Sequence, residues 1–310
     1  MTSVTPAASP PQRIELPATS PKRVKLLENV RDALQSIPVY FDSGTHIEGL
    51  EASDLFNLNS VLSSSIEIQV VDTLNRIRKV WDPDDEWPEH HFERSSQTFP
   101  DVRLLSRSGG TVSVVLGIEL KGWYLLAREG EPSFRYKVTP AVCSEFDLLV
   151  VVPWHLKNVL SGVPVVYEPY IEQARYAAEY RNYWWQHVRE TTADTSIKPP
   201  AAATLGPYPP PKTKVNDEAT KDTGRNFGRV ARIVLMDNYV EALLGKRVSG
   251  VEGRHWVMFF KTYAEAADPA VITQRLAAEL QKASVAGTTE AADVIAGLLI
   301  ELATSLRPGG

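Results

Sequence analysis

The chain has 310 residues, of which 43% are hydrophobic and 23% charged, so it is long enough for a substantial core and has the composition of a soluble globular protein. It lacks an apolar run of about 18 residues and an apolar N-terminal core, which excludes a membrane span and a secretory signal and predicts a cytoplasmic protein with no membrane partner. A net charge of −5 argues against non-specific coating of nucleic acid, and a single cysteine, Cys143, excludes an intrachain disulfide and a cysteine metal cluster.

The N-terminal part of the sequence predicts an arm followed by a helix. Residues 1–22 are rich in Pro, Ser, Thr and Ala and lack periodic apolar residues, which is typical of a flexible arm that belongs to no core. From residue 23 onward, apolar residues recur at helical spacing and the pattern stops before Pro38, which predicts the first helix. The residues of this pattern are Val24, Leu27, Val30 and Leu34.

A second helix is predicted over residues 59–81, because its apolar residues form one stripe with Glu67 at the edge. The stripe consists of Ile66, Val70, Leu74, Ile77 and Trp81. An acidic connector follows, and two strands then flank Gly109 and Gly110. The segment EFDLLVVVPW, residues 145–154, is a continuous apolar run that predicts a strand covered on both faces.

The remaining segments complete the predicted organisation. Residues 166–190 predict a long helix, so the order of elements indicates an α/β core over residues 23–190. Residues 191–225 are rich in Pro and predict a long loop or linker, an excursion rather than a separate domain. The C-terminal region, 226–310, is predicted to be mainly helical, with patterns over 226–245, 268–283 and 289–306.

Three charged residues lie in the strand region, and their spacing predicts that they converge. Side chains alternate along a strand, so Glu119 and Lys121 point to one face while the apolar residues between and before them point to the other. If residues 108–110 form a three-residue hairpin loop, Asp101 faces Gly117 and lies diagonal to Glu119 on the same face. The apolar face consists of Val112, Val114, Leu116, Ile118 and Leu120.

The convergence of two carboxylates and a lysine suggests a specific chemistry. Adjacent carboxylates repel unless a positive charge lies between them, and a divalent cation with oxygen ligands meets that need. A neighbouring lysine can position or activate a water and stabilise negative charge that develops on a phosphate. The alternative is a surface ion pair between Glu119 and Lys121 on a solvated sheet face, which contributes little energy.

The dipeptide Pro100-Asp101 and the tripeptide Glu119-Leu120-Lys121 together resemble the PD-(D/E)XK signature of restriction-type nucleases, over roughly residues 58–190. The resemblance implies a restriction-endonuclease-like core, a mixed β-sheet flanked by helices. It also implies that Asp101 and Glu119 bind Mg²⁺, that Lys121 acts on the attacking water, and that Glu67 matches the acidic residue often found on the preceding helix.

The resemblance is strongest to type II restriction endonucleases and implies a Mg²⁺-dependent enzyme that cleaves double-stranded DNA at a specific sequence. A homodimer is expected, because a two-fold axis matches paired cuts across a palindrome, and a cognate DNA methyltransferase is the expected genetic partner. Two alternatives stay open. One is a nuclease of the same fold that acts in DNA repair or another defence system, and the other is a catalytically silent DNA-binding protein.

Basic residues outside the signature are candidates for DNA contacts. Positive side chains that meet phosphates position a protein on the duplex. The candidates are Arg175, Arg181, Lys212, Lys214, Arg225 and Arg229. Asp147, Glu168 and Glu172 could extend the acidic site, but helix capping or solvent exposure is the favoured interpretation of these three carboxylates.

Overall fold

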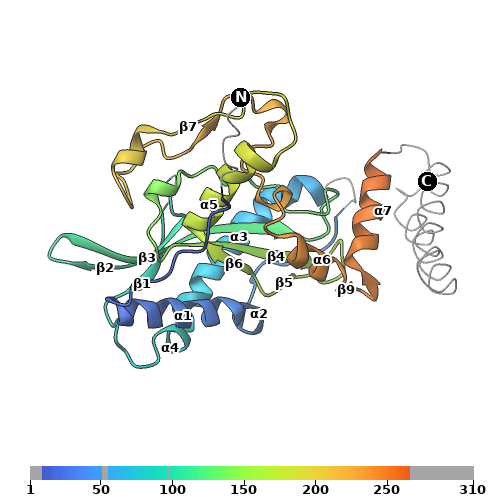
Figure 1. Cartoon of the computed structure of the whole chain (residues 1–310). Coiled ribbons are helices and arrows are strands. Elements are labelled where there is room, and N and C mark those ends of the chain that lie inside the picture. Colours follow the sequence, from blue (N-terminus) through green and yellow to red (C-terminus); the bar gives the residue numbers. More distant parts are fainter. Residues whose placement is uncertain (1–8, 51–54, 96–97, 266–310) are drawn as a thin grey trace, which may run out of the picture.

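The computed structural model describes residues 9–50, 55–95 and 98–265, and the described residues form a mixed six-stranded sheet (Figure 1). The strands β1, β2 and β3 are antiparallel, β4 runs parallel to β3, and both β5 and β6 pair antiparallel with β4. Their bounds are β1 His91–Arg94, β2 Val102–Ser108, β3 Thr111–Tyr124, β4 Leu148–Leu156, β5 Pro164–Val166 and β6 Tyr170–Gln173. The prediction of an α/β fold with a mixed sheet flanked by helices is confirmed.

The helices before the sheet follow the predicted apolar patterns. They are α1 Pro21–Gln35, α2 Ile37–Tyr40, α3 Leu55–Arg76 and α4 Arg78–Trp81. The predicted stripe is buried from Ile66 to Trp81, and α3 packs against β3 and β1. The helical pattern breaks at Ile77, so the predicted second helix is two helices joined at that residue. In Figure 1, α1 and α4 lie together on one side of the sheet.

The strand β4 is buried over its whole length, which confirms the prediction of a strand covered on both faces. The long helix predicted over residues 166–190 is wrong in its first part, because residues 170–173 form β6 along β4. Pro169 disfavours a helix at the residue before it, and the aromatic and β-branched pair Tyr170-Ile171 suits a strand. The helix α5 begins only at Ala174, ends at Tyr183 and continues as a short π-helix, η2, over Trp184–Val188.

The described part of the predicted arm, residues 9–20, lies against the sheet. Ile14 exchanges two hydrogen bonds with the side chain of Gln173, at 2.7 and 2.8 Å, and Arg13 forms an ion pair with Glu172 in β6 at 2.8 Å. Leu16 packs against the core. These contacts differ from the expectation of a free arm, since they attach this stretch to β6.

The segment rich in Pro crosses one side of the molecule, as Figure 1 shows near the label β7, and it contains short regular pieces. These are β7 Ile197–Lys198, η3 Ala201–Thr204, β8 Glu218–Ala219 and η4 Thr223–Arg225. A further short 3-10 helix, η1 Pro140–Val142, lies outside this segment and contacts η3. The backbone of Asn216 pairs with that of Val138, so the segment returns to the core.

The described C-terminal elements are η5 Val230–Arg232, α6 Asp237–Leu244, β9 Arg247–Val248, β10 Val251–Glu252 and α7 Gly253–Glu265. The helix predicted over 226–245 therefore starts about three turns late. Gly228 has a positive φ of 89°, and a Cβ there would lie 3.1 Å from the Tyr136 carbonyl oxygen, so this stretch is a close backbone crossing. The patterns over 268–283 and 289–306 lie outside the described residues. Within the described part of the chain, every helix is too short or too polar to cross a membrane.

Candidate active site

The hairpin that carries the charged residues has a different register from the predicted one. Gly109 and Gly110, with φ of 56° and 81°, form a two-residue turn, and Ser108 pairs with Thr111. The predicted three-residue loop is therefore wrong. Continued without interruption, the observed turn would place Asp101 across from Ile118, on the apolar face.

A β-bulge restores the charged face. Leu105 pairs with Val114 but Leu104 pairs with Leu116, so Val115 is an extra residue in β3. Beyond the bulge Val102 pairs with Ile118, which brings Asp101, the residue before β2, level with Glu119. The carbonyl of Val115 accepts a hydrogen bond from Arg23 of α1 at 2.7 Å, so the bulged backbone is satisfied from outside the sheet.

The structure brings Asp101, Glu119 and Lys121 together, and we call these three residues the acid–lysine cluster. The Lys121 Nζ lies 2.7 Å from Asp101 Oδ2 and 2.9 Å from Glu119 Oε1. The Asp101 carboxylate also accepts a hydrogen bond from the backbone N–H of Leu120 at 3.2 Å. One ammonium group therefore contacts two carboxylates, one from β3 and one from the residue that precedes β2.

Burial and charge set the ionisation of the acid–lysine cluster. Burial raises the pKa of Glu119 to about 7, the positive charge of Lys121 opposes this rise, and the negative charge of Asp101 adds to it. For Lys121, burial lowers the pKa, but the charges and hydrogen bonds of Glu119 and Asp101 outweigh burial and the net shift is upward. The lysine is thus held as a cation, which suits it to stabilise negative charge rather than to accept a proton.

Glu67 reaches the edge of the acid–lysine cluster from α3. Its Oε1 accepts a hydrogen bond from the backbone N–H of Gly122 in β3 at 3.1 Å. Burial raises the pKa of Glu67, and the charge of Lys121 opposes the rise. A Cβ at Gly122 would lie 2.9 Å from the Cβ of Ser63, so the missing side chain lets α3 approach the strand closely.

A buried carboxylate, Asp147, supports the other side of β3. It accepts hydrogen bonds from the backbone N–H groups of Gly117 and Ser144, both at 2.8 Å, and from the hydroxyl of Tyr208. Burial raises the pKa of Asp147 to about 6, against the effect of these bonds. The expectation of a capping or solvated residue is therefore wrong, since Asp147 is a buried acceptor that joins β3 to the segment rich in Pro.

The two other acidic residues considered with Asp147 are not in the acid–lysine cluster. Glu172 is buried in β6 and pairs with Arg13, so the expectation of a solvated or capping residue is wrong for it as well. Glu168 is exposed, as expected, and its carbonyl accepts a hydrogen bond from the Tyr239 hydroxyl.

Glu119 lines a cleft of about 570 Å³ that the sequence did not predict. The other lining residues are Ser133, Arg135, Lys137, Val138 and Asn216. Arg135 and Lys137 stand two residues apart on a stretch outside the sheet, and this spacing of basic residues was the signal available in the sequence. The lining of the cleft thus includes a carboxylate of the acid–lysine cluster and two basic side chains.

The donor set of the acid–lysine cluster fits Mg²⁺. Among the described residues there is no group of three or more His, Cys, Asp and Glu side chains arranged to hold a metal. Mg²⁺, however, is usually bound through one or two carboxylates together with waters and substrate phosphates. Asp101 and Glu119 supply such a pair of hard oxygen ligands, and both of their carboxylates already contact one cationic group, the Lys121 ammonium.

Two of the six predicted DNA contacts are engaged inside the protein. Arg181 is 1% exposed, and it binds Asp217 and backbone carbonyls, so its predicted contact with a phosphate is wrong. Arg175 donates to the carbonyl of Cys143 at 2.7 Å. Of the other four, Lys212 and Arg225 are exposed, Arg229 is partly buried, and the exposed Lys214 forms an ion pair with Glu218 at 2.5 Å. None of the six lines the cleft beside Glu119.

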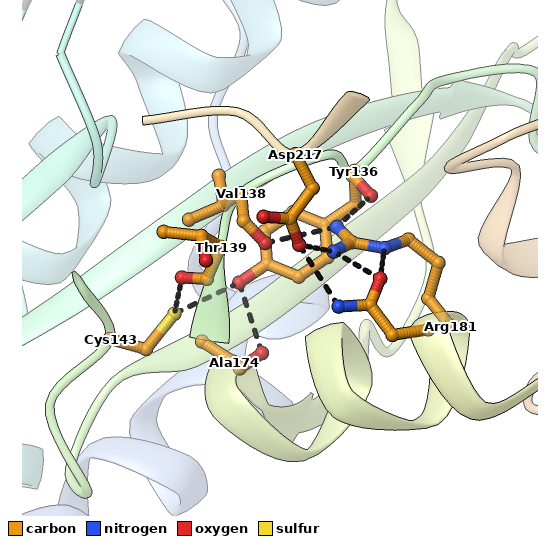
Figure 2. A network of polar contacts seen from close by, with 8 residues as sticks. Tyr136, Val138, Thr139, Cys143, Ala174, Arg181 and Asp217 are labelled. Atoms are coloured by element: carbon orange, nitrogen blue, oxygen red, sulfur yellow. Dashed lines mark hydrogen bonds and ion pairs between the residues drawn. The ribbon is translucent and has the colours of Figure 1, made fainter. Parts of the chain in front are cut away.

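Figure 2 shows the network around Arg181. Its guanidinium donates to the carbonyls of Tyr136 and Val138 at 2.8 and 2.9 Å, and to Asp217 Oδ2 at 2.6 Å. Asn182 also donates to Asp217, at 3.0 Å. This network connects α5 to two stretches that line the cleft. Lys137 stands between the two carbonyls that Arg181 binds, and Asn216 precedes Asp217.

Comparisons with known proteins give no further guidance. No family model matches this chain, and no curated protein or solved structure matches it significantly.

A glycine in β3 leads to a stability prediction. A Cβ at Gly117 would lie 2.5 Å from Pro100 Cγ and 2.7 Å from Asp147 Oδ1, so Gly117→Ala forces both neighbours to move and should destabilise the fold by about 1–3 kcal/mol. Gly44→Ala is the matched control, because a Cβ at Gly44 meets no atom within 4 Å. Urea unfolding of both variants tests this, and equal midpoints would contradict the close approach at Gly117.

Proposed function

We propose that this protein is a Mg²⁺-dependent endonuclease that hydrolyses phosphodiester bonds of double-stranded DNA. The observation that carries the proposal is the contact of one lysine, Lys121, with two carboxylates, Asp101 and Glu119. Of these three residues Glu119 lines a cleft, and basic side chains line the same cleft. Carboxylates suit a hard metal ion, and a held ammonium suits a phosphate that gains negative charge.

The acid–lysine cluster and Glu67 divide the work of phosphodiester hydrolysis. Asp101 and Glu119 would hold Mg²⁺, which when bound supplies positive charge to the phosphate and lowers the pKa of a water. Lys121 stays protonated, orients the attacking water by hydrogen bonding and stabilises the charge of the transition state. Glu67 binds the backbone of Gly122 and so fixes α3 against the strand that carries Glu119 and Lys121.

A type II restriction enzyme that acts as a homodimer at a specific sequence is the narrower form of the proposal. Its support is the resemblance of Pro100-Asp101 and Glu119-Leu120-Lys121 to the nuclease signature, together with the mixed sheet that places these residues side by side. A repair or other defence nuclease of the same fold and a catalytically silent DNA-binding protein are the competing outcomes of the test.

The test is digestion of a sequenced plasmid with the purified protein in Mg²⁺, in Ca²⁺ and in EDTA, followed by sequencing of the fragment ends. Discrete fragments with one common end sequence in Mg²⁺ alone are the expected result. A smear that depends on Mg²⁺ would support the nuclease proposal but contradict cleavage at a specific sequence. Intact plasmid in Mg²⁺, over a range of protein concentrations and temperatures, would overturn the nuclease proposal.

A further inference from the structure

A second hollow lies next to the cleft that Glu119 lines. It has a volume of about 280 Å³, and Asn216 lines both spaces. All the residues that line the second hollow belong to the segment rich in Pro. Those with charged or amide side chains are Lys198, Lys214, Asn216 and Glu218. The shared residue makes the two spaces neighbours, and we call the two spaces together the groove.

The lining of the groove contains four basic side chains and two carboxylates, Glu119 and Glu218. The cleft contributes Arg135 and Lys137, and the second hollow contributes Lys198 and Lys214. Lys214 is compensated by Glu218, and Lys137 lies 3.6 Å from Asp222. Between described residues, no ion pair includes Arg135 or Lys198, and both are exposed. Two cations of the groove are therefore available to an anionic ligand, and a third is only loosely paired.

Lysines from both hollows act on the same carboxyl group, that of Glu218. The pKa of the Glu218 carboxyl is lowered first by the Lys214 hydrogen bond, and the charges of Lys198 and Lys137 lower it further. Lys198 is also the strand partner of Glu218 in the β7–β8 pair. The two lysines of the second hollow and Lys137 of the cleft thus all lie near enough to Glu218 to act on the same carboxylate.

Internal bonds hold the groove in one shape. The backbone N–H of Asp217 donates to the carbonyl of Lys137 at 2.8 Å, and that of Thr139 donates to Val215 at 2.8 Å. Arg181 adds the buried contacts of Figure 2 to the same two stretches. A site that is formed before the ligand arrives loses less entropy on binding, and the adjacent prolines of the second hollow also have a restricted backbone.

We propose that Arg135, Lys137 and Lys198 form a phosphate track, a row of side chains that binds consecutive backbone phosphates of one strand of duplex DNA. The track leads from the acid–lysine cluster across Asn216 to the segment rich in Pro. It rests on the proposed function, because the scissile phosphate beside Glu119 is one end of the bound strand. The contacts are to phosphate oxygens, so the track sets affinity and register and reads no bases.

The experiment measures binding of a duplex oligonucleotide by fluorescence anisotropy in Ca²⁺ at several salt concentrations. The double variant Arg135→Ala/Lys198→Ala should bind more weakly, and its log affinity should depend less steeply on log salt by about 0.9 for each phosphate contact removed. The charge-retaining double variant Arg135→Lys/Lys198→Arg should keep the slope of the unaltered protein.

The matched control is Lys25→Ala/Lys157→Ala, which removes the same charge from two exposed lysines that line neither hollow. It should leave the slope unchanged. An unaltered slope in the Arg135→Ala/Lys198→Ala protein, an equal loss in the control, or no duplex binding by the unaltered protein would each overturn the track.

The outcome for the track is separate from the outcome for the nuclease. A protein that leaves plasmid intact but loses salt-dependent binding through Arg135 and Lys198 has the track without the proposed activity. A protein that cuts DNA but binds equally well after both substitutions has the activity without the track. Thermal melts of every variant confirm that a change in slope comes from a folded protein.

Discussion

Lys121→Ala is expected to reduce DNA cleavage by about 10²-fold or more and to leave most of the DNA binding in place. The reason is the position of the Lys121 ammonium, which contacts both Asp101 and Glu119 and is held in its charged form. Removing it takes away the positive charge that faces the phosphate in the transition state. Binding draws mainly on other cations, which meet phosphates away from the reacting bond.

The measurement pairs a cleavage time course in Mg²⁺ with a gel-shift titration in Ca²⁺, and thermal melts report on folding. Asp101→Asn is the second variant, because it keeps the shape of the side chain and removes one charge. It should also abolish cleavage, and it should tighten binding without metal, since one negative charge no longer faces the backbone of the DNA.

Lys25→Ala is the matched control for Lys121→Ala, because Lys25 also pairs with a carboxylate at 2.7 Å but does so at the surface, with Asp84. This variant should cleave normally. Near-normal cleavage by a folded Lys121→Ala protein would mean that the acid–lysine cluster is a structural ion pair and that the reaction takes place at another site.

The strand β4 and the helix α3 were predictable because their patterns are local. The continuous apolar run of β4 has one interpretation at its length, and the stripe from Ile66 to Trp81 follows the period of a helix. The strand β6 was missed because it has only four residues and the helix α5 follows it directly. Its pairing with β4 comes from the tertiary structure and leaves no periodic signal.

The convergence of the three charges was predicted through a register that the structure does not have. The sequence shows two glycines, which fit both a two-residue and a three-residue turn. The bulge at Val115 moves the pairing by one residue, and its carbonyl is bonded by Arg23, which lies 92 residues earlier. A bulge that is stabilised by so distant a residue cannot be derived from the alternation of side chains along one strand.

One basic residue was assigned wrongly and two of the cleft were missed, for a related reason. Arg181 has the sequence context of an exposed helical arginine, and its partner Asp217 lies 36 residues later, in a segment without periodic structure. Arg135 and Lys137, by contrast, belong to no strong helix or strand pattern, and only the fold places them beside Glu119. Side chains that bind a ligand and side chains that brace the protein thus look alike until their partners are known.

Arg181→Met is expected to lower the free energy of unfolding by about 3–5 kcal/mol, because it removes one partner of a buried ion pair. The side chains of Arg181 and Asp217 are 1% and 2% exposed, and their atoms are 2.6 Å apart. After the substitution the buried Asp217 carboxyl keeps the hydrogen bond from Asn182 but loses the guanidinium, and the carbonyls of Tyr136 and Val138 lose the same donor. A buried polar group without a partner lowers the free energy of unfolding, because it has lost its hydrogen bonds to water and gains none in the protein.

Urea unfolding measures the loss, and Lys214→Ala provides the comparison. The pair of Lys214 with Glu218 is as short, at 2.5 Å, but both side chains are more than half exposed, so its removal should cost far less than the removal of Arg181. Arg181→Lys should not restore stability, because one ammonium cannot reproduce the planar guanidinium that meets Asp217 and two carbonyls together. The double variant Arg181→Met/Asp217→Leu removes both charges and should recover part of the loss. If Arg181→Met were no more destabilising than Lys214→Ala, the buried network would not brace the cleft wall, and the stretches that carry Lys137 and Asn216 would have to be held by their backbone pairing alone.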